Sequence, residues 1–344
     1  MYLPKLRFFL CLVTGLLILI GLFKQDAFTY LLPQSAPQRT LQSTLQSTPQ
    51  ITPQSTPQST PQSTPQSTPQ STLQSITSAP SGQLAASKPS IAKVTIIFGD
   101  DPIYQGALKT HEEHGRKFGY RTHVLRSGIL DDVWTKPAFL LSLLLEELVK
   151  PEAERLDWIL WFDADTVVMN PNIPIELFLP PADFPDVHIL LTKDWNGLNN
   201  GVFPIRVHPW SVELLSAVIA YPHTYPDTLL VFRDQSALEK LLENDYYKNS
   251  TIYAPLRWFN AYRGATDGSL NDYHPPELQL RKGDFLVHFA GTSGLDRSES
   301  MNAFIEVAER HDPDWRVPLS RTNYSSEIEA FWAEQRIKRS MSES

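Results

Sequence analysis

The sequence predicts a single α/β domain with a mostly parallel central sheet, preceded by an N-terminal transmembrane helix and an extended stalk. An uncharged apolar segment lies near the N-terminus, a four-residue repeat follows it, and apolar runs alternate with helix-like segments across residues 91–344. This alternation of strands and helices favours parallel strands joined by right-handed crossovers. The 344 residues carry a formal net charge of −8, so the composition does not indicate nucleic-acid binding.

Residues 8–23 read FFLCLVTGLLILIGLF and contain no charged side chain. A helix of this length spans about 24 Å, which suits a thin membrane. Lys5 and Arg7 precede the segment, whereas Lys24 and Asp26 follow it and cancel each other. This asymmetry predicts a cytosolic tail at 1–7 and a luminal remainder. A cleaved signal peptide is the alternative, but no cleavage site of the A-x-A type follows the segment, so an uncleaved anchor is favoured.

Residues 24–90 are expected to form a disordered stalk rich in Ser, Thr, Pro and Gln. Within it, residues 40–75 consist of TPQS-like and TLQS-like tetrads in register. Recurrent proline excludes a helix, and the polar composition cannot form a core, so an extended, polyproline-II-like chain is predicted. In a lumen, such a segment invites O-glycosylation, although a simple spacer is an equal alternative. Cys11 lies inside the anchor and is the sole cysteine, so the luminal part has no internal disulfide.

Residues 91–344 are expected to form the luminal domain. Strand-like segments are predicted at 93–101, 120–125 and 158–163, and helix-like segments at 104–119 and 135–150. Further along the chain, residues 190–211 are expected to form a strand, a polar turn and a second strand. A helix is then expected to begin within 232–242, and a short strand is expected within 283–291. Sequons at Asn249 and Asn323 could carry N-glycans.

Two carboxylates follow directly after the predicted buried strand WILWF, at Asp163 and Asp165. In open α/β sheets, ligands bind beyond the carboxyl ends of the strands. Neighbouring carboxylates repel, and a divalent cation relieves that repulsion; Mg²⁺ or Mn²⁺ suits such ligands and is commonly shared with phosphates. The D-x-D pattern alone is weak, because it recurs at 312–314 after no predicted strand. The structural alternative is a turn capped by Asp163 with a solvated Asp165.

Three functions are compatible with this pattern. A haloacid-dehalogenase-type phosphatase would use Asp163 as a nucleophile, but its motif normally follows the first strand, whereas two strand–helix units precede it here. A nucleotide-sugar glycosyltransferase would use the carboxylates to hold a metal on the donor diphosphate, and the anchor, stalk and luminal domain favour it. A catalytically inactive, stalked glycan-binding protein is the third alternative.

Five segments then appear in order: WTKPAFL (134–140), WFDADTVVMNP (161–171), GLNNGVFPIRVHPWS (197–211), RDQSAL (233–238) and HFAG (288–291). In this order and spacing the chain resembles glycosyltransferase family 34, the α-galactosyl- and α-mannosyltransferases of the Golgi. The resemblance implies a GT-A fold, a metal-dependent retaining transfer, and a single-pass type II protein of the Golgi or endoplasmic reticulum membrane.

The resemblance also assigns roles to individual residues. The implied metal ligands are Asp163, Asp165 and His288; the implied catalytic residues are Asp234 and Gln235; the further implied donor-binding residues are Lys136, Asn199, Asn200, Gly201 and Gly291. The structural alternatives are a core histidine at 288, a plain hairpin turn at 199–201 and a helix-terminal acidic residue at 234. Trp134 is a further candidate near the nucleotide, or a core residue.

The implied cofactor is Mn²⁺, with Mg²⁺ as the alternative, and the implied donor is UDP-galactose or GDP-mannose. An oligosaccharide or glycoprotein would be the acceptor, and complexes with other Golgi glycosyltransferases are an expected kind of partner. One departure concerns the segment after HFAG, where the family often carries a basic residue. Here TSGLD intervenes before Arg297. Either Arg297 turns back towards the site or that contact is absent.

Overall fold

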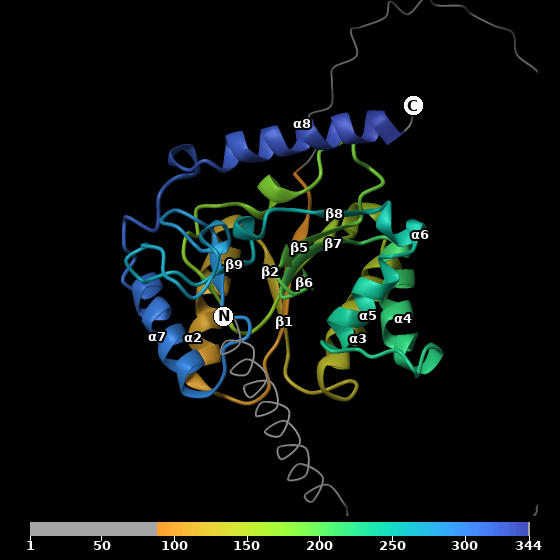
Figure 1. The fold of residues 1–344 in the computed structure, drawn as a ribbon, viewed down its shortest axis with the longest axis horizontal. Helices are drawn as coiled ribbons and strands as arrows, with labels where there is room; N and C mark the ends of the chain where they lie inside the picture. Colours follow the sequence, from red (N-terminus) through yellow and green to blue (C-terminus); the bar gives the residue numbers. More distant parts are fainter. Residues whose placement is uncertain (1–87, 343–344) are drawn as a thin grey trace, which may run out of the picture. The chain divides into compact units, whose positions relative to one another are not determined.

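The structure, a computed structural model, describes residues 88–342. The expected cytosolic tail, the anchor at 8–23 and the stalk up to residue 87 lie outside the described residues. Within 88–342, none of the helices combines the length and the apolar character needed to cross a membrane. The described chain folds as helices on both sides of a central sheet (Figure 1).

The central sheet has seven strands in the order β2-β1-β3-β7-β5-β6, with β8 paired to β5. Their bounds are β1 Ile91–Ile96, β2 Arg121–Leu125, β3 Trp158–Phe162, β5 Ile189–Asp194, β6 Gly197–Asn199, β7 Val202–Arg206 and β8 Thr251–Tyr253. A second sheet has the order β4-β10-β9, with bounds β4 Thr166–Val168, β9 Ala261–Tyr262 and β10 Leu286–His288.

The central sheet is mixed, so the prediction of a mostly parallel sheet is correct only for part of it. The β2–β1, β1–β3 and β5–β8 pairs are parallel, as expected for the alternating segments at the start of the domain. In contrast, β7 is antiparallel to both β3 and β5, and β6 is antiparallel to β5. Because β7 is antiparallel to β3, the first residue of β7 lies next to the last residue of β3. This reversal brings the 199–201 segment to the carboxylates that follow β3.

The helices form two outer layers. Helices α2 and α7 lie on one side of the sheet, and α3, α4 and α5 lie on the other (Figure 1). Helix α8 lies across the end of the sheet at which β1 begins. The bounds are α2 Pro102–Phe118, α3 Thr135–Leu148, α4 Pro209–Thr224, α5 Asp234–Leu241, α6 Asp245–Lys248, α7 Gly294–Glu309 and α8 Tyr324–Ser342.

Strand β3 is buried on both faces, which explains its continuous apolar sequence. Trp158, Leu160 and Phe162 face the core that α8 helps to close, whereas Ile159 and Trp161 face α3 and α4. Each of these large side chains contributes roughly 1.5–3 kcal/mol through its burial. The strand is therefore held firmly at the point where Asp163 leaves it.

Local signals fix the helix boundaries. Helix α2 begins with Pro102 in its first turn, where Asp101 accepts a hydrogen bond from the Ile103 amide, and it ends before Gly119, whose φ of 81° closes the helix. Helix α4 begins at Pro209, so the second apolar strand expected within 190–211 stops earlier than the motif indicated. A proline in the first turn and the His208 side chain at the N-cap explain that boundary.

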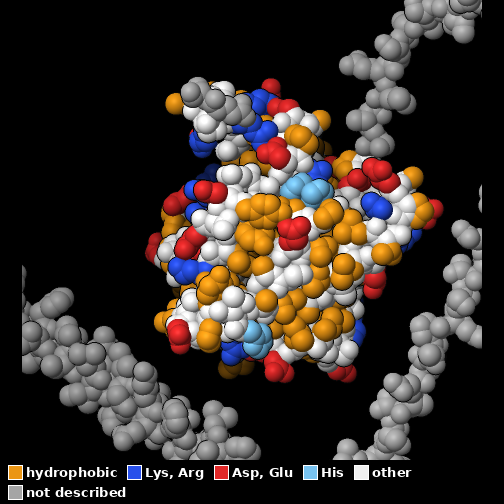
Figure 2. Space-filling model, turned by 90° about the vertical axis from the view of Figure 1, so that its right-hand side faces the viewer, with side chains coloured by type: hydrophobic (Ala, Val, Ile, Leu, Met, Phe, Trp, Pro, Cys, Tyr) orange, Lys and Arg blue, Asp and Glu red, His pale blue; other side chains and the backbone are white. Residues whose placement is uncertain are grey.

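Apolar side chains reach the surface on the side that carries α3 and α4. Leu145 is 49% exposed and Val149 is 84% exposed. Figure 2 looks onto the right-hand side of the molecule in Figure 1 and shows hydrophobic side chains gathered there among a few acidic and basic ones. Leu145 and Val149 do not line the cavity onto which Asp163 and Asp165 open.

Candidate active site

A tight turn presents the two carboxylates. The Asp163 amide donates to the Gly201 carbonyl at 2.8 Å, which continues the β3–β7 pairing by one residue. The Thr166 hydroxyl donates to the Asp163 carbonyl at 2.7 Å and thereby closes the turn before β4. His111 of α2 lies 2.9 Å from the same hydroxyl. Because that hydroxyl already donates to Asp163, it accepts from the Nε2–H of His111.

His288 reaches the carboxylates from the second sheet. It pairs with Thr166 across the antiparallel β10–β4 ladder. Its Nε2 atom lies 3.4 Å from Asp165 Oδ1 and 3.9 Å from Asp163 Oδ2. The three ligand atoms lie within 4.8 Å of one another. The expected metal ligands therefore converge, and their separation suits one shared cation.

The hydrogen bond of His288 Nδ1 determines which ring nitrogen of His288 carries the proton. Nδ1 lies 2.8 Å from Asn260 Oδ1. The Asn260 amide nitrogen donates to Thr192 and Asn199, so the Asn260 oxygen is the acceptor that remains for Nδ1–H. A neutral imidazole in this arrangement turns the lone pair of Nε2 towards the carboxylates.

The Lys136 ammonium lies at the centre of the site. It donates to Asp163 Oδ1 at 3.1 Å and to the Asn200 carbonyl at 3.0 Å, and it lies 3.9 Å from Asp234 Oδ2. Burial lowers the pKa of Lys136, but the charges of Asp163 and Asp234 outweigh that effect and raise it. The lysine is therefore charged, and it compensates carboxylates that come from two different elements.

The residues at the start of α5 meet the 199–201 segment. Asn200 donates through its side chain to Asp234 Oδ2 at 3.0 Å, and its amide donates to the Gln235 side-chain oxygen at 3.2 Å. Burial raises the pKa of Asp234, whereas Lys136 and Asn200 act in the opposite direction. Asp234 and Gln235 thus lie beside Asn200.

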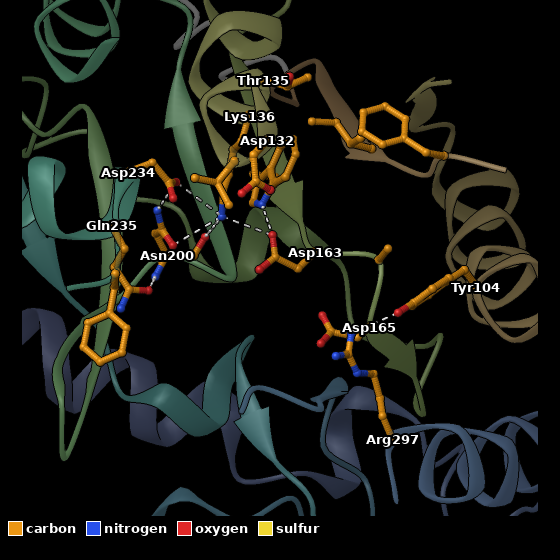
Figure 3. A pocket seen from close by; sticks show the side chains of 16 residues that line it. Tyr104, Asp132, Thr135, Lys136, Asp163, Asp165, Asn200, Asp234, Gln235 and Arg297 are labelled. Atoms are coloured by element: carbon orange, nitrogen blue, oxygen red, sulfur yellow. Dashed lines mark hydrogen bonds and ion pairs between the residues drawn. The ribbon is translucent and has the colours of Figure 1, made fainter. Parts of the chain in front are cut away.

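A cavity of about 380 Å³ opens onto these groups (Figure 3). It is lined by Lys136, Asp163, Asp165, Asn200, Asp234, Gln235, Asp132, Tyr104, Arg297 and neighbouring apolar side chains. Arg297 turns back into this cavity and donates to the Tyr104 hydroxyl at 2.9 Å. The first of the two alternatives, that Arg297 turns back towards the site, therefore agrees with its place in the cavity lining, whereas a contact with a donor diphosphate stays a prediction. Burial acts to raise the pKa of Asp165, but its contact with the His288 side chain and the charge of Arg297 outweigh that effect and lower the pKa.

Not all expected residues line the cavity. Asn199 points away, towards Asp194 and Tyr262. Gly201 lies against the His288 ring, and its role here is to leave room for that ring. Gly291 has a φ of 73° with open space around it, and it is not among the lining residues of the described cavity. Trp134 packs on the apolar core beside α3, which agrees with the alternative that it is a core residue.

Three residues that hold the site were not identified from the sequence. Asn260 orients His288, and His111 and Thr166 hold the Asp163 turn. Thr166 lies within the motif WFDADTVVMNP, so its position next to the two carboxylates could have identified it. Asn260 and His111 occur in segments without a recognisable motif, and only tertiary contacts give them a role.

The fold and the site together define an α/β protein with a candidate ligand site at the strand ends. Two cationic side chains, Lys136 and Arg297, flank this site. Residues 181–297 match the model of the galactosyl transferase GMA12/MNN10 family. This match confirms the resemblance to glycosyltransferase family 34 that the motifs indicate.

Curated relatives carry related names. The probable α-1,6-mannosyltransferase MNN10 of Saccharomyces cerevisiae is 28% identical over 48% of this chain and 49% of its own length. An α-1,2-galactosyltransferase of Schizosaccharomyces pombe is 25% identical over 59% of this chain and 62% of its own length. The chain thus spans about half to two thirds of these relatives.

Among solved structures, a glycosyltransferase involved in glycosylation of the major capsid of PBCV-1 aligns with 62% of this chain and 99% of its own. The TM-score is 0.47 and the sequence identity is 19%.

Proposed function

We propose that this protein is a retaining, metal-dependent glycosyltransferase with a GT-A fold. It moves a hexosyl group from a nucleotide sugar to a hydroxyl of a glycan acceptor and forms an α-linkage. The observation that carries the proposal is the convergence of Asp163, Asp165 and His288 beside the Lys136 ammonium. The names of the relatives support galactose or mannose as the transferred sugar, and hence UDP-galactose or GDP-mannose as the donor.

The residues present fit a divalent cation. The lone pair of a neutral His288 Nε2 faces two carboxylates, and this arrangement is repulsive until a cation lies between them. Two carboxylates and one imidazole suit Mn²⁺, and Mg²⁺ is the alternative. Asp163, Asp165 and His288 would hold the ion. When bound, the ion would supply positive charge against the departing nucleoside diphosphate.

The two cationic side chains of the cavity bind the phosphates. Lys136 and Arg297 both line it, and they lie beside Asp163 and Asp165 respectively. Charge-assisted hydrogen bonds from such groups to phosphate oxygens are shorter and stronger than neutral ones. The donor diphosphate therefore lies between Lys136 and Arg297, and the sugar extends towards Asn200 and α5.

Asp234 and Gln235 face the anomeric carbon. The Gln235 oxygen accepts from the Asn200 amide, which leaves its NH₂ group free to contact the substrate. Asp234 is held by Asn200 and stabilises positive charge that develops on the sugar ring. An amide is a poor nucleophile, which favours a front-face route. The acceptor hydroxyl then enters on the face from which the phosphate leaves, and the configuration is retained.

The cellular setting is part of the proposal. An apolar segment at 8–23 with positive charge before it supports a type II protein anchored in the Golgi or endoplasmic reticulum membrane, with the domain in the lumen. An oligosaccharide or glycoprotein would be the acceptor, and other Golgi glycosyltransferases are candidate partners. Protease added to intact microsomes is expected to spare the domain. Its digestion without detergent would contradict this topology.

A donor screen tests the reaction. The full-length protein in detergent is incubated with Mn²⁺ and each nucleotide sugar, and release of nucleoside diphosphate is measured with and without saccharide acceptors. Asp163→Asn and Asp165→Asn should each abolish release while the melting temperature without metal stays close to that of wild type. Asp314→Asn is the matched control, because it alters the second D-x-D sequence, whose Asp314 pairs with Lys282 on the surface.

The phosphatase alternative predicts a different result. A phosphatase that uses Asp163 as its nucleophile would accumulate an aspartyl-phosphate on that residue. Detection of this adduct by mass spectrometry, or absence of diphosphate release with every donor, would overturn the transferase proposal.

A further inference from the structure

Trp195 lies at the tip of the β5–β6 hairpin and is 56% exposed. The hairpin around it is held on both sides. The Asn196 amide donates to Asp194 Oδ1 at 2.6 Å, and the Leu198 amide donates to Glu239 Oε1 at 3.0 Å. A large aromatic side chain at a fixed and exposed position has a surface available for a ligand.

A second aromatic ring supports Trp195 from one side. The rings of Trp195 and His274 are stacked, with centroids 5.4 Å apart and an interplanar angle of 20°. Tyr262 lies against both rings, at 5.2 Å from Trp195 and 4.8 Å from His274. Burial lowers the pKa of His274, and the charge of Arg263 lowers it further, so the imidazole is neutral. One face of the indole is therefore covered, and much of the rest is open.

These rings are connected to the candidate active site. The Tyr262 ring lies 6.4 Å from the His288 ring. Its hydroxyl accepts from the Asn199 side chain at 2.8 Å, and Asn199 in turn accepts from the Gly201 amide at 2.9 Å. Trp195 is thus separated from a candidate metal ligand by one intervening ring. It does not line the cavity that contains Lys136 and Arg297.

The long segment between β9 and β10 carries the His274 ring that supports Trp195. Tyr273 lies on it next to His274 and is 72% exposed, with the Arg263 guanidinium 5.0 Å from its ring centre. The buried Gln279 holds this segment, because its side chain donates to the Asn271 carbonyl at 2.7 Å and accepts from the Asn271 amide at 2.9 Å. Long segments that are held in place near a site commonly carry binding residues.

We propose that the open face of Trp195, which His274 supports from the opposite face, is a platform that binds a hexopyranose ring of the acceptor glycan. The inference rests on the proposed function. The C–H groups on one face of a pyranose pack against the electron-rich face of an aromatic ring. The exposed Asn196 side chain at the same hairpin tip can hydrogen-bond the sugar hydroxyls. Because the platform lies outside the cavity with the cations, it takes the acceptor rather than the charged donor.

The experiment measures saccharide binding and kinetics separately in the full-length protein. Saturation-transfer NMR is recorded with methyl glycosides and disaccharides of mannose, galactose and glucose. Trp195→Ala should remove the saccharide signals and raise the KM for the acceptor at least about 10-fold. The KM for the nucleotide sugar should change by about twofold at most. Trp195→Phe should retain most of the binding.

Tyr225→Ala is the matched control, because Tyr225 is an aromatic residue that is 52% exposed, at the end of α4. Saccharide signals that are equal in Trp195→Ala and wild type would overturn the platform, as would absence of any signal in wild type. Failure of the proposed function has a different signature. In that case no donor is cleaved, whereas the loss of saccharide signals in Trp195→Ala would still be observed.

Discussion

Gly201→Ala is expected to remove the candidate metal site through a single methyl group. A Cβ atom on Gly201 would lie 2.1 Å from His288 Cε1 and 2.7 Å from its Nδ1. The backbone of Gly201 does not have a positive φ, so alanine meets no conformational penalty of its own. The whole effect of the substitution therefore falls on the His288 ring.

The magnitude follows from these distances. The nearest ring atom would have to move by about 1.4 Å to reach a van der Waals separation of about 3.5 Å. Metal–nitrogen distances tolerate deviations of only about 0.2 Å. The same movement breaks the 2.8 Å hydrogen bond to Asn260. We expect Mn²⁺ affinity to fall about 10- to 100-fold. The free energy of unfolding without metal should decrease by about 1–3 kcal/mol.

Calorimetric titration with Mn²⁺ and melting curves with and without the ion provide the assay. Gly128→Ala is the matched control, because its Cβ would make ordinary contacts at 3.6 and 3.7 Å. In a His288→Ala background the ring is gone, so adding Gly201→Ala should cost no further stability. Wild-type Mn²⁺ affinity in Gly201→Ala would refute the reasoning, and so would full additivity of the two stability losses.

Three further changes test other parts of the structure. Lys136→Met leaves Asp163 and Asp234 without their cation, and a loss of about 3 kcal/mol in a urea titration is expected; Asp234→Asn in the same chain should restore most of it, and no recovery would argue against the ion pair. Thr166→Val removes the hydroxyl that closes the Asp163 turn, so Mn²⁺ affinity in a calorimetric titration should fall about 10-fold, with Thr166→Ser as the conservative control. Burial, with nearby positive charge, lowers the pKa of His188 from 6.5 to about 4, so the folded protein loses about 3 kcal/mol of stability as pH falls from 6.5 to 4. His188→Phe should flatten that part of the stability profile, and an unchanged slope would exclude His188 as its source.

The sequence was most informative where a local pattern determines the structure. The five apolar residues of β3 required burial on both faces, and the acid after them marked the end of the strand. The beginning of α5 at Asp234 was recognisable from its polar first turn. The direction of β7 was not recognisable, because a continuous apolar run such as Val202–Ile205 suits a parallel and an antiparallel strand equally. The contact between Asn260 and His288 joins residues 28 positions apart, and no pattern along the chain encodes it.

The position at which the described chain begins bears on access to the candidate active site. Strand β1 starts at Ile91, at the end of the sheet that α8 covers, whereas Asp163 leaves β3 at the opposite end. The described chain therefore begins at the end of the domain opposite to the candidate active site. Under the proposed function, an acceptor would reach the candidate active site from the end of the sheet opposite to residue 88, so that the segment joined to this residue need not lie in its path.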